Sequence, residues 1–199
     1  MIPHAFTDRL ARAQEALTAT GVNALLVTPG PGLRYLTGYD ARAMERLTCL
    51  VLPAVGEAAL VVPRLELPAA QAAGVGDLDV RLAPWDETDE PVFLAVSLLP
   101  RVAIVAVDDH MWAEKVLMFR DAMADVELVA AGPILSDLRL VKSADELERL
   151  RAAAAAIDRV HARVPEWLAA GRTEAEVGRD IADAIITEGH ATVDFVIVA

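Results

Sequence analysis

One short segment, residues 33–40, gathers side chains that could recognise a ligand. It contains the guanidinium of Arg34, the phenols of Tyr35 and Tyr39, and the carboxylate of Asp40. Guanidinium groups bind carboxylates through paired hydrogen bonds, and a few convergent polar groups set the specificity of a binding site. The cluster therefore predicts recognition of a peptide or a carboxylate. The alternative is a structural turn that buries Tyr35 and the adjacent leucine in the core.

A second candidate is Trp85, which lies between Pro84 and Asp86. Proline and aspartate are typical of turns. One interpretation is an exposed loop aromatic that contacts a ligand, and the other is an anchor that packs the loop against the domain. The single cysteine, Cys49, lies in an apolar run and is expected to be a buried small hydrophobe.

The histidines and carboxylates show no spacing typical of a metal site. No two of the four histidines are three or four residues apart, the spacing that puts two ligands on one helix face. Asp108, Asp109 and His110 follow a predicted strand, where α/β proteins often place functional loops. The alternative is that Asp108 or Asp109 caps a helix starting at Met111. Asp194 alone cannot form a site, so no catalytic residue and no metal ligand is assigned.

Two other catalytic patterns are absent from the sequence. No Gly-x-Ser-x-Gly nucleophile motif occurs. Gly30 and Gly32 follow a predicted strand, but Pro29 and Pro31 remove the N–H donors that a phosphate-binding loop needs.

Composition limits the partners and the compartment. The formal net charge is −12, which repels nucleic acid and anionic membrane surfaces. No apolar stretch approaches the roughly 20 residues that span a bilayer, and the first residues lack the basic and apolar parts of a signal peptide. One cysteine allows no internal disulfide. We therefore expect a cytoplasmic protein that binds neither nucleic acid nor membranes.

The part of the chain before Pro133 predicts an α/β domain with a mixed sheet and flanking helices. The connection from Pro53 to Glu57 suits a hairpin, whereas helices between other strands suit parallel crossovers. Prolines and glycines at 29–32 are expected to form a loop. Strands are expected at 24–27, 47–52, 58–62, 78–82, 102–107 and 126–129, and helices at 7–20, 64–73, 91–99 and 111–123.

Helical patterns follow Pro133. Capping boxes at 143–146 and 173–176 open two helices, the first expected to bend or break at Pro165. The alternating residues 192–198 predict a strand. Because that strand has no predicted neighbour and both helices carry apolar stripes, we expect that the chain is cut short or that a partner chain completes it.

Several segments, in this order, resemble the creatinase/prolidase family. Residues 24–27 (ALLV) and 32–39 (GLRYLTGY) resemble the opening of its amino-terminal domain, and residues 50–64 are similar to the hairpin that follows. Residues 138–152 (LRLVKSADELERLRA) look like the junction where the catalytic domain of the family begins. Residues 171–199 contain two segments similar to that second domain.

The resemblance implies an amino-terminal domain over residues 1–136 and the incomplete start of a pita-bread catalytic domain over residues 137–199. It implies a parent metallopeptidase, an Xaa-Pro aminopeptidase or dipeptidase that hydrolyses the peptide bond before proline. Two divalent ions, manganese, cobalt or zinc, are expected in the full-length parent, where they activate a bridging water. The matching segments end before the metal ligands of the family, so this chain alone is expected to be inactive.

The resemblance also implies roles for particular residues. Amino-terminal domains of the family often reach toward the active site of a neighbouring subunit, which makes Tyr39, Asp40 and Trp85 substrate-gate residues. Phe195 matches a position that helps to wall the substrate pocket, and its alternative is a core residue of an amphipathic strand. The chain is therefore expected to serve as scaffold, substrate gate and homodimer contact.

Two other functions stay open. One is a naturally truncated, non-catalytic module that dimerises or binds peptide. The other is a creatinase-like parent that cleaves a non-peptide C–N bond.

Overall fold

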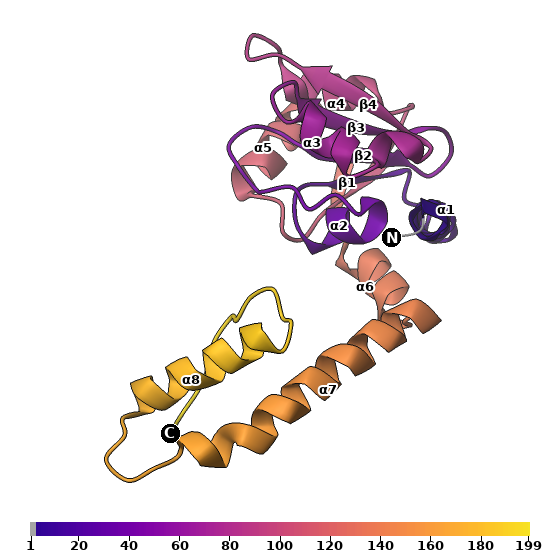
Figure 1. Cartoon of the computed structure of the whole chain (residues 1–199). Helices are drawn as coiled ribbons and strands as arrows, with labels where there is room; N and C mark the ends of the chain where they lie inside the picture. Colours follow the sequence, from indigo (N-terminus) through magenta and orange to yellow (C-terminus); the bar gives the residue numbers. More distant parts are fainter. Residues whose placement is uncertain (1–2) are drawn as a thin grey trace. The chain divides into compact units, whose positions relative to one another are not determined.

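The apolar runs of the first part of the chain form one mixed sheet in the computed structural model, which describes residues 3–199 and side chains from residue 5 onward. The β1–β2 and β2–β3 pairs are antiparallel, whereas β3–β4, β1–β5 and β5–β6 are parallel. The predicted α/β domain with a mixed sheet is confirmed. The strand order is β4-β3-β2-β1-β5-β6 (Figure 1), with β1 Ala24–Val27, β2 Cys49–Pro53, β3 Ala58–Pro63, β4 Val80–Trp85, β5 Ile104–Val107 and β6 Glu127–Ala130.

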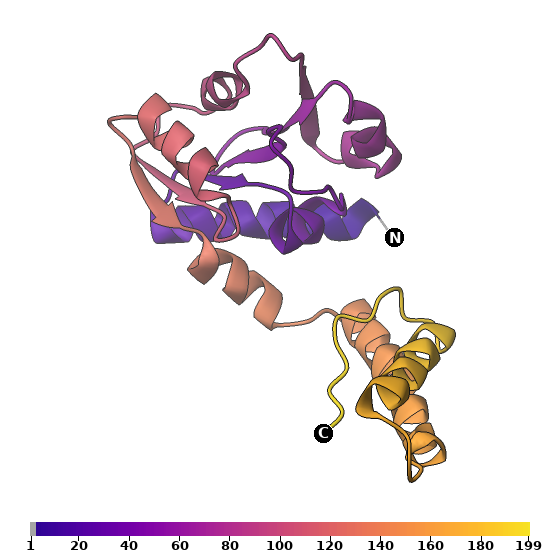
Figure 2. The same ribbon diagram turned by 90° about the vertical axis from the view of Figure 1, so that its left-hand side faces the viewer.

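Helices cover both faces of this sheet (Figure 2). Successive strand residues point to opposite faces, so Leu25 and Val27 join one core cluster and Ala24 and Leu26 the other. Because both faces are covered, β1, β2 and β3 are buried along their whole length. The first cluster includes residues of α1 (Pro3–Thr20), α2 (Pro31–Thr37), α3 (Leu67–Ala72), the short 3-10 helix η1 (Val75–Asp77) and α6 (Gly132–Leu140); the second includes residues of α4 (Pro91–Ser97) and α5 (Ala113–Ala122).

Helix α2 corrects the prediction of a loop after β1. Pro31 occupies the first turn, where its fixed φ suits a helix and its missing N–H costs nothing. The helix ends at Gly38, which adopts φ 75° and donates its N–H to the carbonyl of Arg34 at 2.9 Å. Arg34 and Tyr35 therefore lie on a helix and not in a loop-rich segment.

The described residues separate into two units, Met1–Leu140 and Val141–Ala199. The second unit contains α7 (Ala144–Trp167) and α8 (Glu174–Thr187). Both predicted capping boxes are confirmed, because the Ser143 and Thr173 hydroxyls accept the backbone N–H groups of Glu146 and Glu176, each at 3.3 Å. Of the predicted bend or break at Pro165, the break is wrong, since α7 continues through this residue and ends just after it, at Trp167; the bend stays a prediction.

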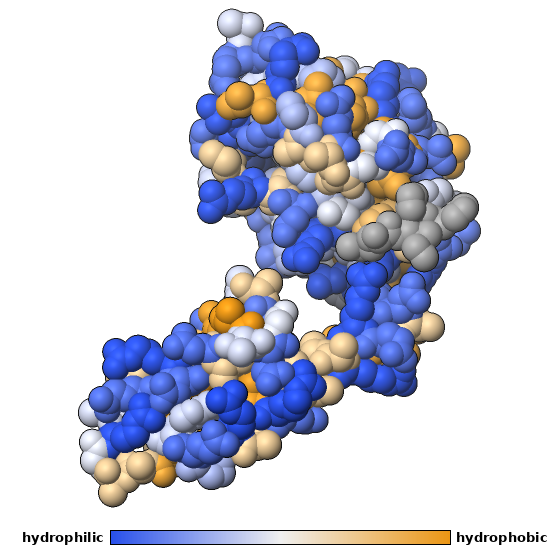
Figure 3. Space-filling view, viewed as in Figure 1, coloured by the Kyte–Doolittle hydropathy of each residue, from blue (hydrophilic) through white to orange (hydrophobic). Residues whose placement is uncertain are grey.

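The predicted strand at residues 192–198 is also wrong. This segment has no regular secondary structure, because a strand needs hydrogen bonds from a neighbouring strand and the described residues place none beside it. Its large apolar side chains are exposed, Phe195 by 77% and Ile197 by 80%. On the face shown in Figure 3, hydrophilic residues predominate and hydrophobic ones occur in small groups in both units. Among the described helices, none is both long and apolar enough to cross a membrane.

Candidate functional site

Several strand ends meet at one edge of the sheet. The registers place Leu26 beside Val107 and Pro63 beside Trp85, and the antiparallel strand β2 starts at this same edge. In open α/β sheets, ligands bind outside the carboxyl ends of parallel strands. The residues that follow β1, β3, β4 and β5, and those that precede β2, are therefore the first candidates for a functional site.

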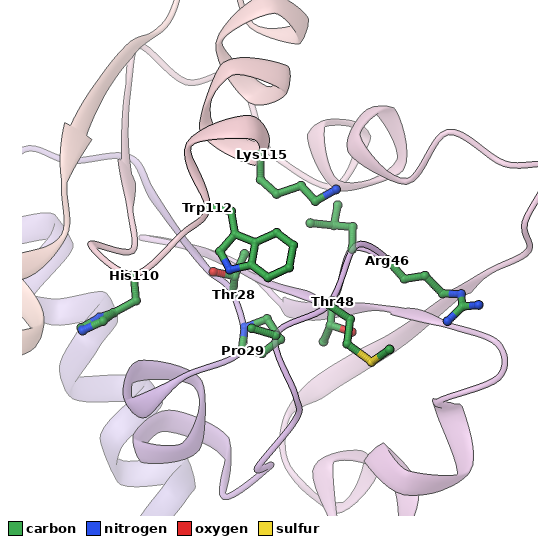
Figure 4. A pocket seen from close by; sticks show the side chains of 10 residues that line it. Thr28, Pro29, Arg46, Thr48, His110, Trp112 and Lys115 are labelled. Atoms are coloured by element: carbon green, nitrogen blue, oxygen red, sulfur yellow. The ribbon is translucent and has the colours of Figure 1, made fainter.

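A pocket lies at this edge, between two strands whose following connections go to opposite faces of the sheet. Strand β1 leads into α2 on one face and β5 leads into α5 on the other. Such a switch opens a crevice between the two strand ends. The pocket has about 280 Å³ of empty space, part of it open to solvent (Figure 4). Its lining includes the apolar Pro29, Met44, Leu47 and Trp112 and the basic Arg46, His110 and Lys115, with no acidic residue among the described ones that line it.

The basic side chains of the pocket are held by neighbouring groups. Lys115 is only 12% exposed, and its ammonium donates to the backbone carbonyl of Glu45 at 2.7 Å. Arg46 donates from Nε to the carboxylate of Glu87 at 2.7 Å. This hydrogen bond and the negative charge of Glu87 raise the pKa of Arg46, so Arg46 keeps its charge throughout the physiological range.

Another ion pair joins the ends of β3 and β4. Arg64 donates from Nε to the carboxylate of Asp86 at 2.7 Å, and this hydrogen bond lowers the pKa of Asp86. The backbone N–H of Asp86 donates to the carboxylate of Asp89, also at 2.7 Å. The loop after β4 is therefore fixed by charge and by a local turn.

Trp85 packs at this edge as an anchor. Its side chain is 6% exposed, and its indole N–H donates to the backbone carbonyl of Leu47 at 2.9 Å. The predicted exposed loop aromatic is therefore wrong, because the residue belongs to strand β4 and its ring lies in the second core cluster. Trp85 instead fixes the segment before β2, which forms one wall of the pocket.

Tyr39 lies just beyond α2 and is buried. Its backbone N–H donates to the Thr37 hydroxyl at 3.2 Å. Burial, and secondarily the negative charge of Glu66, raise the pKa of Tyr39. Glu66 also accepts a hydrogen bond from the buried hydroxyl of Thr48, the residue before β2, at 3.3 Å, so its carboxylate acts on both Tyr39 and Thr48.

The other two predicted site residues, Asp40 and Phe195, take no part in these hydrogen bonds. The Asp40 carboxylate is mostly exposed and lies 3.4 Å from a terminal nitrogen of Arg34, whose side chain is also exposed. Phe195 belongs to the second unit. The interpretation of Phe195 as a core residue of a strand is wrong, because its side chain is exposed and its segment forms no strand.

Asp109 connects the loop after β5 to another helix, and neither Asp108 nor Asp109 caps α5. The α5 cap position is Trp112, with no side-chain hydrogen bond, so the capping prediction is wrong. Asp109 instead accepts the backbone N–H of Gly132 at the start of α6, at 2.8 Å. Asp108 is 3% exposed and lies 3.5 Å from Nδ1 of His110, while its Oδ2 has no hydrogen-bond partner among the described atoms.

The pocket residues Thr28, Arg46, Trp112 and Lys115 were not predicted from the sequence. Their position directly after strands could have identified three of them. Thr28 directly follows the apolar strand β1, and Trp112 and Lys115 follow β5, so they share the edge where α/β sheets bind ligands.

The described side chains do not form a metal centre. In residues 3–199 as described, no group of three or more His, Cys, Asp or Glu side chains is arranged to hold a metal ion. Asp108 has an unpartnered buried oxygen, but the side chain that the structure pairs with it is a single histidine. Two-ion hydrolytic centres need several carboxylate or histidine ligands. These residues therefore do not fit such a centre, and no catalytic step is assigned to a metal here.

Sequence comparison connects the first unit to a known family model. Residues 9–141 match the model of the Creatinase/Prolidase N-terminal domain. The chain is 46% identical over 194 residues to the probable dipeptidase PepE of Mycobacterium tuberculosis, covering 97% of this chain and 52% of that protein. It is 24% identical over 190 residues to an uncharacterized peptidase of Staphylococcus aureus, covering 94% of this chain and 52% of that protein. The chain thus spans about half the length of the curated relatives it matches.

Structural comparison gives the same result. The crystal structure of dipeptidase PepE from Mycobacterium ulcerans matches with a TM-score of 0.92 and 46% identity, over 99% of this chain and 53% of that one. The recombinant prolidase from Thermococcus sibiricus matches with a TM-score of 0.79 and 26% identity, over 94% of this chain and 50% of that one.

Proposed function

This chain belongs to the creatinase/prolidase N-terminal domain family, and on that premise we propose that it forms the amino-terminal portion of a peptidase that hydrolyses the peptide bond before proline. The likeness to the dipeptidase from Mycobacterium ulcerans carries the peptidase part of this proposal, and the likeness to the prolidase from Thermococcus sibiricus supports the preference for proline. The first of these extends over 99% of the chain at 46% identity, and so includes the second unit as well as the matched domain.

The proposed role of the first unit is to present one edge of its sheet to a peptide substrate. Trp85 and the Arg64–Asp86 pair fix the loops of that edge. Tyr39 is buried near them, and its phenol is uncharged because burial raises its pKa. Asp40 is a mostly exposed carboxylate beside this set, and it would contact a substrate ammonium or amide in competition with its ion pair to Arg34. Tyr39 and Trp85 thus position the gate, whereas Asp40 contacts the substrate.

The proposed role of the second unit is to begin the catalytic domain of the parent. Its two helices pack through small and branched residues, Ala156, Val160, Val177 and Ala184. Other apolar side chains, including Leu150, Ile186 and Phe195, are exposed. Exposed apolar surface of this kind marks a face that other residues or a partner chain cover. A catalytic domain, with Phe195 in the wall of its substrate pocket, would provide that cover.

The same proposal places a pair of divalent ions, manganese, cobalt or zinc, in the parent protein and outside the residues described here. Such ions would supply an activated water and a Lewis acid for the peptide carbonyl. The parent is proposed to be a homodimer in which one subunit's amino-terminal domain reaches the neighbouring active site.

Kinetics of the longer parent protein test this proposal. We expect hydrolysis of Ala-Pro and little hydrolysis of Ala-Ala. Asp40→Asn should raise KM with little change in kcat, because it removes a contact made equally in the ground state and the transition state. Asp121→Asn, at an exposed carboxylate paired with its own neighbour Arg120, is the matched control. Equal turnover of Ala-Pro and Ala-Ala would contradict the proposed specificity.

A further inference from the structure

We propose that Lys115 is a positioning residue for the substrate gate, because its ammonium holds the gate loop, residues 40–46, against the edge of the sheet. The effect on catalysis rests on the proposed function, in which Asp40 is the loop residue that contacts the substrate. The contact between Lys115 and the loop lies within the first unit. It can therefore be tested on this chain alone.

The gate loop has few restraints from its own backbone. It lies between α2 and β2 without helix or strand, and most of its residues are exposed. No backbone–backbone hydrogen bond is described for residues 40–46. Ala43 and Met44 line the open pocket, where Met44 is 39% exposed, so apolar packing covers this part of the loop incompletely. A segment with few buried contacts and few backbone hydrogen bonds opens easily unless side chains hold it.

Lys115 provides such a side chain from a distant element. It lies on α5, 70 residues after Glu45 in the sequence, and its ammonium donates to the Glu45 carbonyl at 2.7 Å. Figure 4 shows Lys115 leaving α5 in the direction of the segment that carries Arg46. The Lys115 side chain is only 12% exposed, and the carboxylate of Glu114 lies 3.6 Å from its ammonium and balances the charge. A hydrogen bond from a charged donor is stronger than a neutral one, and burial reduces competition from water.

The other ion pairs of the loop are more exposed. Arg46 donates to Glu87 at 2.7 Å, but the Glu87 side chain is 70% exposed. At the other end of the loop, Asp40 lies 3.4 Å from Arg34, and both side chains are mostly exposed. Ion pairs in such positions contribute little to stability. The mostly buried hydrogen bond from Lys115 is therefore the contact whose loss should release the loop.

Limited digestion of the whole 199-residue chain with trypsin measures how often the loop opens. Trypsin cleaves after arginine, and Arg42 is exposed in the gate loop. When opening and closing are fast, the cleavage rate of a folded chain follows the population of its open form. Lys115→Met should speed cleavage after Arg42 about tenfold or more, as expected for the loss of one charge-assisted hydrogen bond.

Arg120→Met is the matched control for this digestion. Arg120 lies on the same helix, its replacement also removes one trypsin site, and its guanidinium pairs with its own neighbour Asp121. It should leave cleavage after Arg42 unchanged. If Lys115→Met does not fold, backbone order parameters of residues 42–45 in the unaltered chain decide instead. Values of about 0.8 or more are expected for a loop held in place, and values below about 0.6 would overturn the proposal.

Kinetics of the longer parent protein separate positioning from a merely structural role. Lys115→Met should raise KM for Ala-Pro about threefold or more with little change in kcat, because a smaller fraction of the protein presents Asp40 correctly. Arg120→Met should change neither constant. A merely structural role would lower kcat through loss of folded protein and leave KM unchanged.

The digestion and the kinetics fail in different ways. If the parent does not hydrolyse Ala-Pro, the proposed function is wrong, while the digestion still decides whether Lys115 holds the loop. Equal cleavage after Arg42 in the Lys115→Met and Arg120→Met variants would overturn the contact. Faster cleavage in Lys115→Met with an unchanged KM would overturn the role of Lys115 in the substrate gate.

Discussion

Replacing Gly38 by alanine should destabilise the first unit more than the same change at Gly21. Both glycines follow a helix and both adopt φ 75°. A residue with a Cβ pays roughly 1–2 kcal/mol for a left-handed backbone, and this cost should be similar at the two positions. The two sites differ in the space around the new methyl group.

At Gly21 an added Cβ meets no described atom within 4 Å, whereas at Gly38 it lies 2.7 Å from Cζ and 2.8 Å from Cε2 of the Phe6 ring. Phe6 is buried in the first core cluster, so its ring cannot simply move into solvent. Overpacking of a core costs about 1–3 kcal/mol. Adding this to the backbone cost predicts a loss of roughly 2–5 kcal/mol for Gly38→Ala and about 1–2 kcal/mol for Gly21→Ala.

Urea unfolding followed by tryptophan fluorescence measures the difference. A Trp167→Phe background removes the tryptophan of the second unit, so Trp85 and Trp112 report on the first. Phe6→Leu combined with Gly38→Ala should recover at least about 1 kcal/mol relative to the sum of the single changes, because the two side chains are in contact. Equal losses for the two glycine variants, or strict additivity with Phe6→Leu, would refute the steric explanation.

Three further predictions concern single contacts. Trp85→Phe should lower the free energy of unfolding by about 1–3 kcal/mol, because the buried Leu47 carbonyl loses its donor, and urea unfolding measures this. Arg64→Met should raise the pKa of Asp86 toward its ordinary value, and a carboxyl NMR titration measures this. Because the pKa of Asp86 is lower in the folded state than in the unfolded state, the ion pair stabilises the fold fully at a pH above the unfolded-state pKa. That stabilisation is lost as the pH falls through the folded-state pKa. Thr173→Ala should cost α8 about 1 kcal/mol, seen as faster amide exchange in its first turn.

The features that the sequence predicted correctly are those set by local pattern. The apolar runs at 24–27 and 58–62 became buried strands because the helices between the strands cover both faces of the sheet. The capping boxes at 143–146 and 173–176 formed because each is closed by atoms three residues apart. A loop was predicted at Pro31, whereas helix α2 starts there. Proline interrupts a helix in its interior but is favoured in its first turn, so the residue type alone does not distinguish the two cases.

The features that the sequence did not predict depend on distant parts of the chain. One interpretation had Asp108 or Asp109 cap the helix that follows, but the partner of Asp109 is Gly132 at the start of another helix. For Trp85 the sequence left both an exposed loop aromatic and a packed anchor open, and the carbonyl that decides for the anchor belongs to the distant Leu47. The pocket is made by segments that meet only when β1, β2 and β5 are paired. Residues 192–198 show the converse, because a strand pattern forms no strand without a neighbour.

The most direct test of the account is an activity measurement on the purified 199-residue chain, with manganese, cobalt or zinc supplied and the bound metal counted. We predict no stoichiometric metal and no hydrolysis of Ala-Pro by this chain, while the longer parent protein hydrolyses it under the same conditions. Turnover of Ala-Pro by the 199 residues alone with metal bound in stoichiometric amount would contradict the claim that catalysis belongs to other residues of the parent.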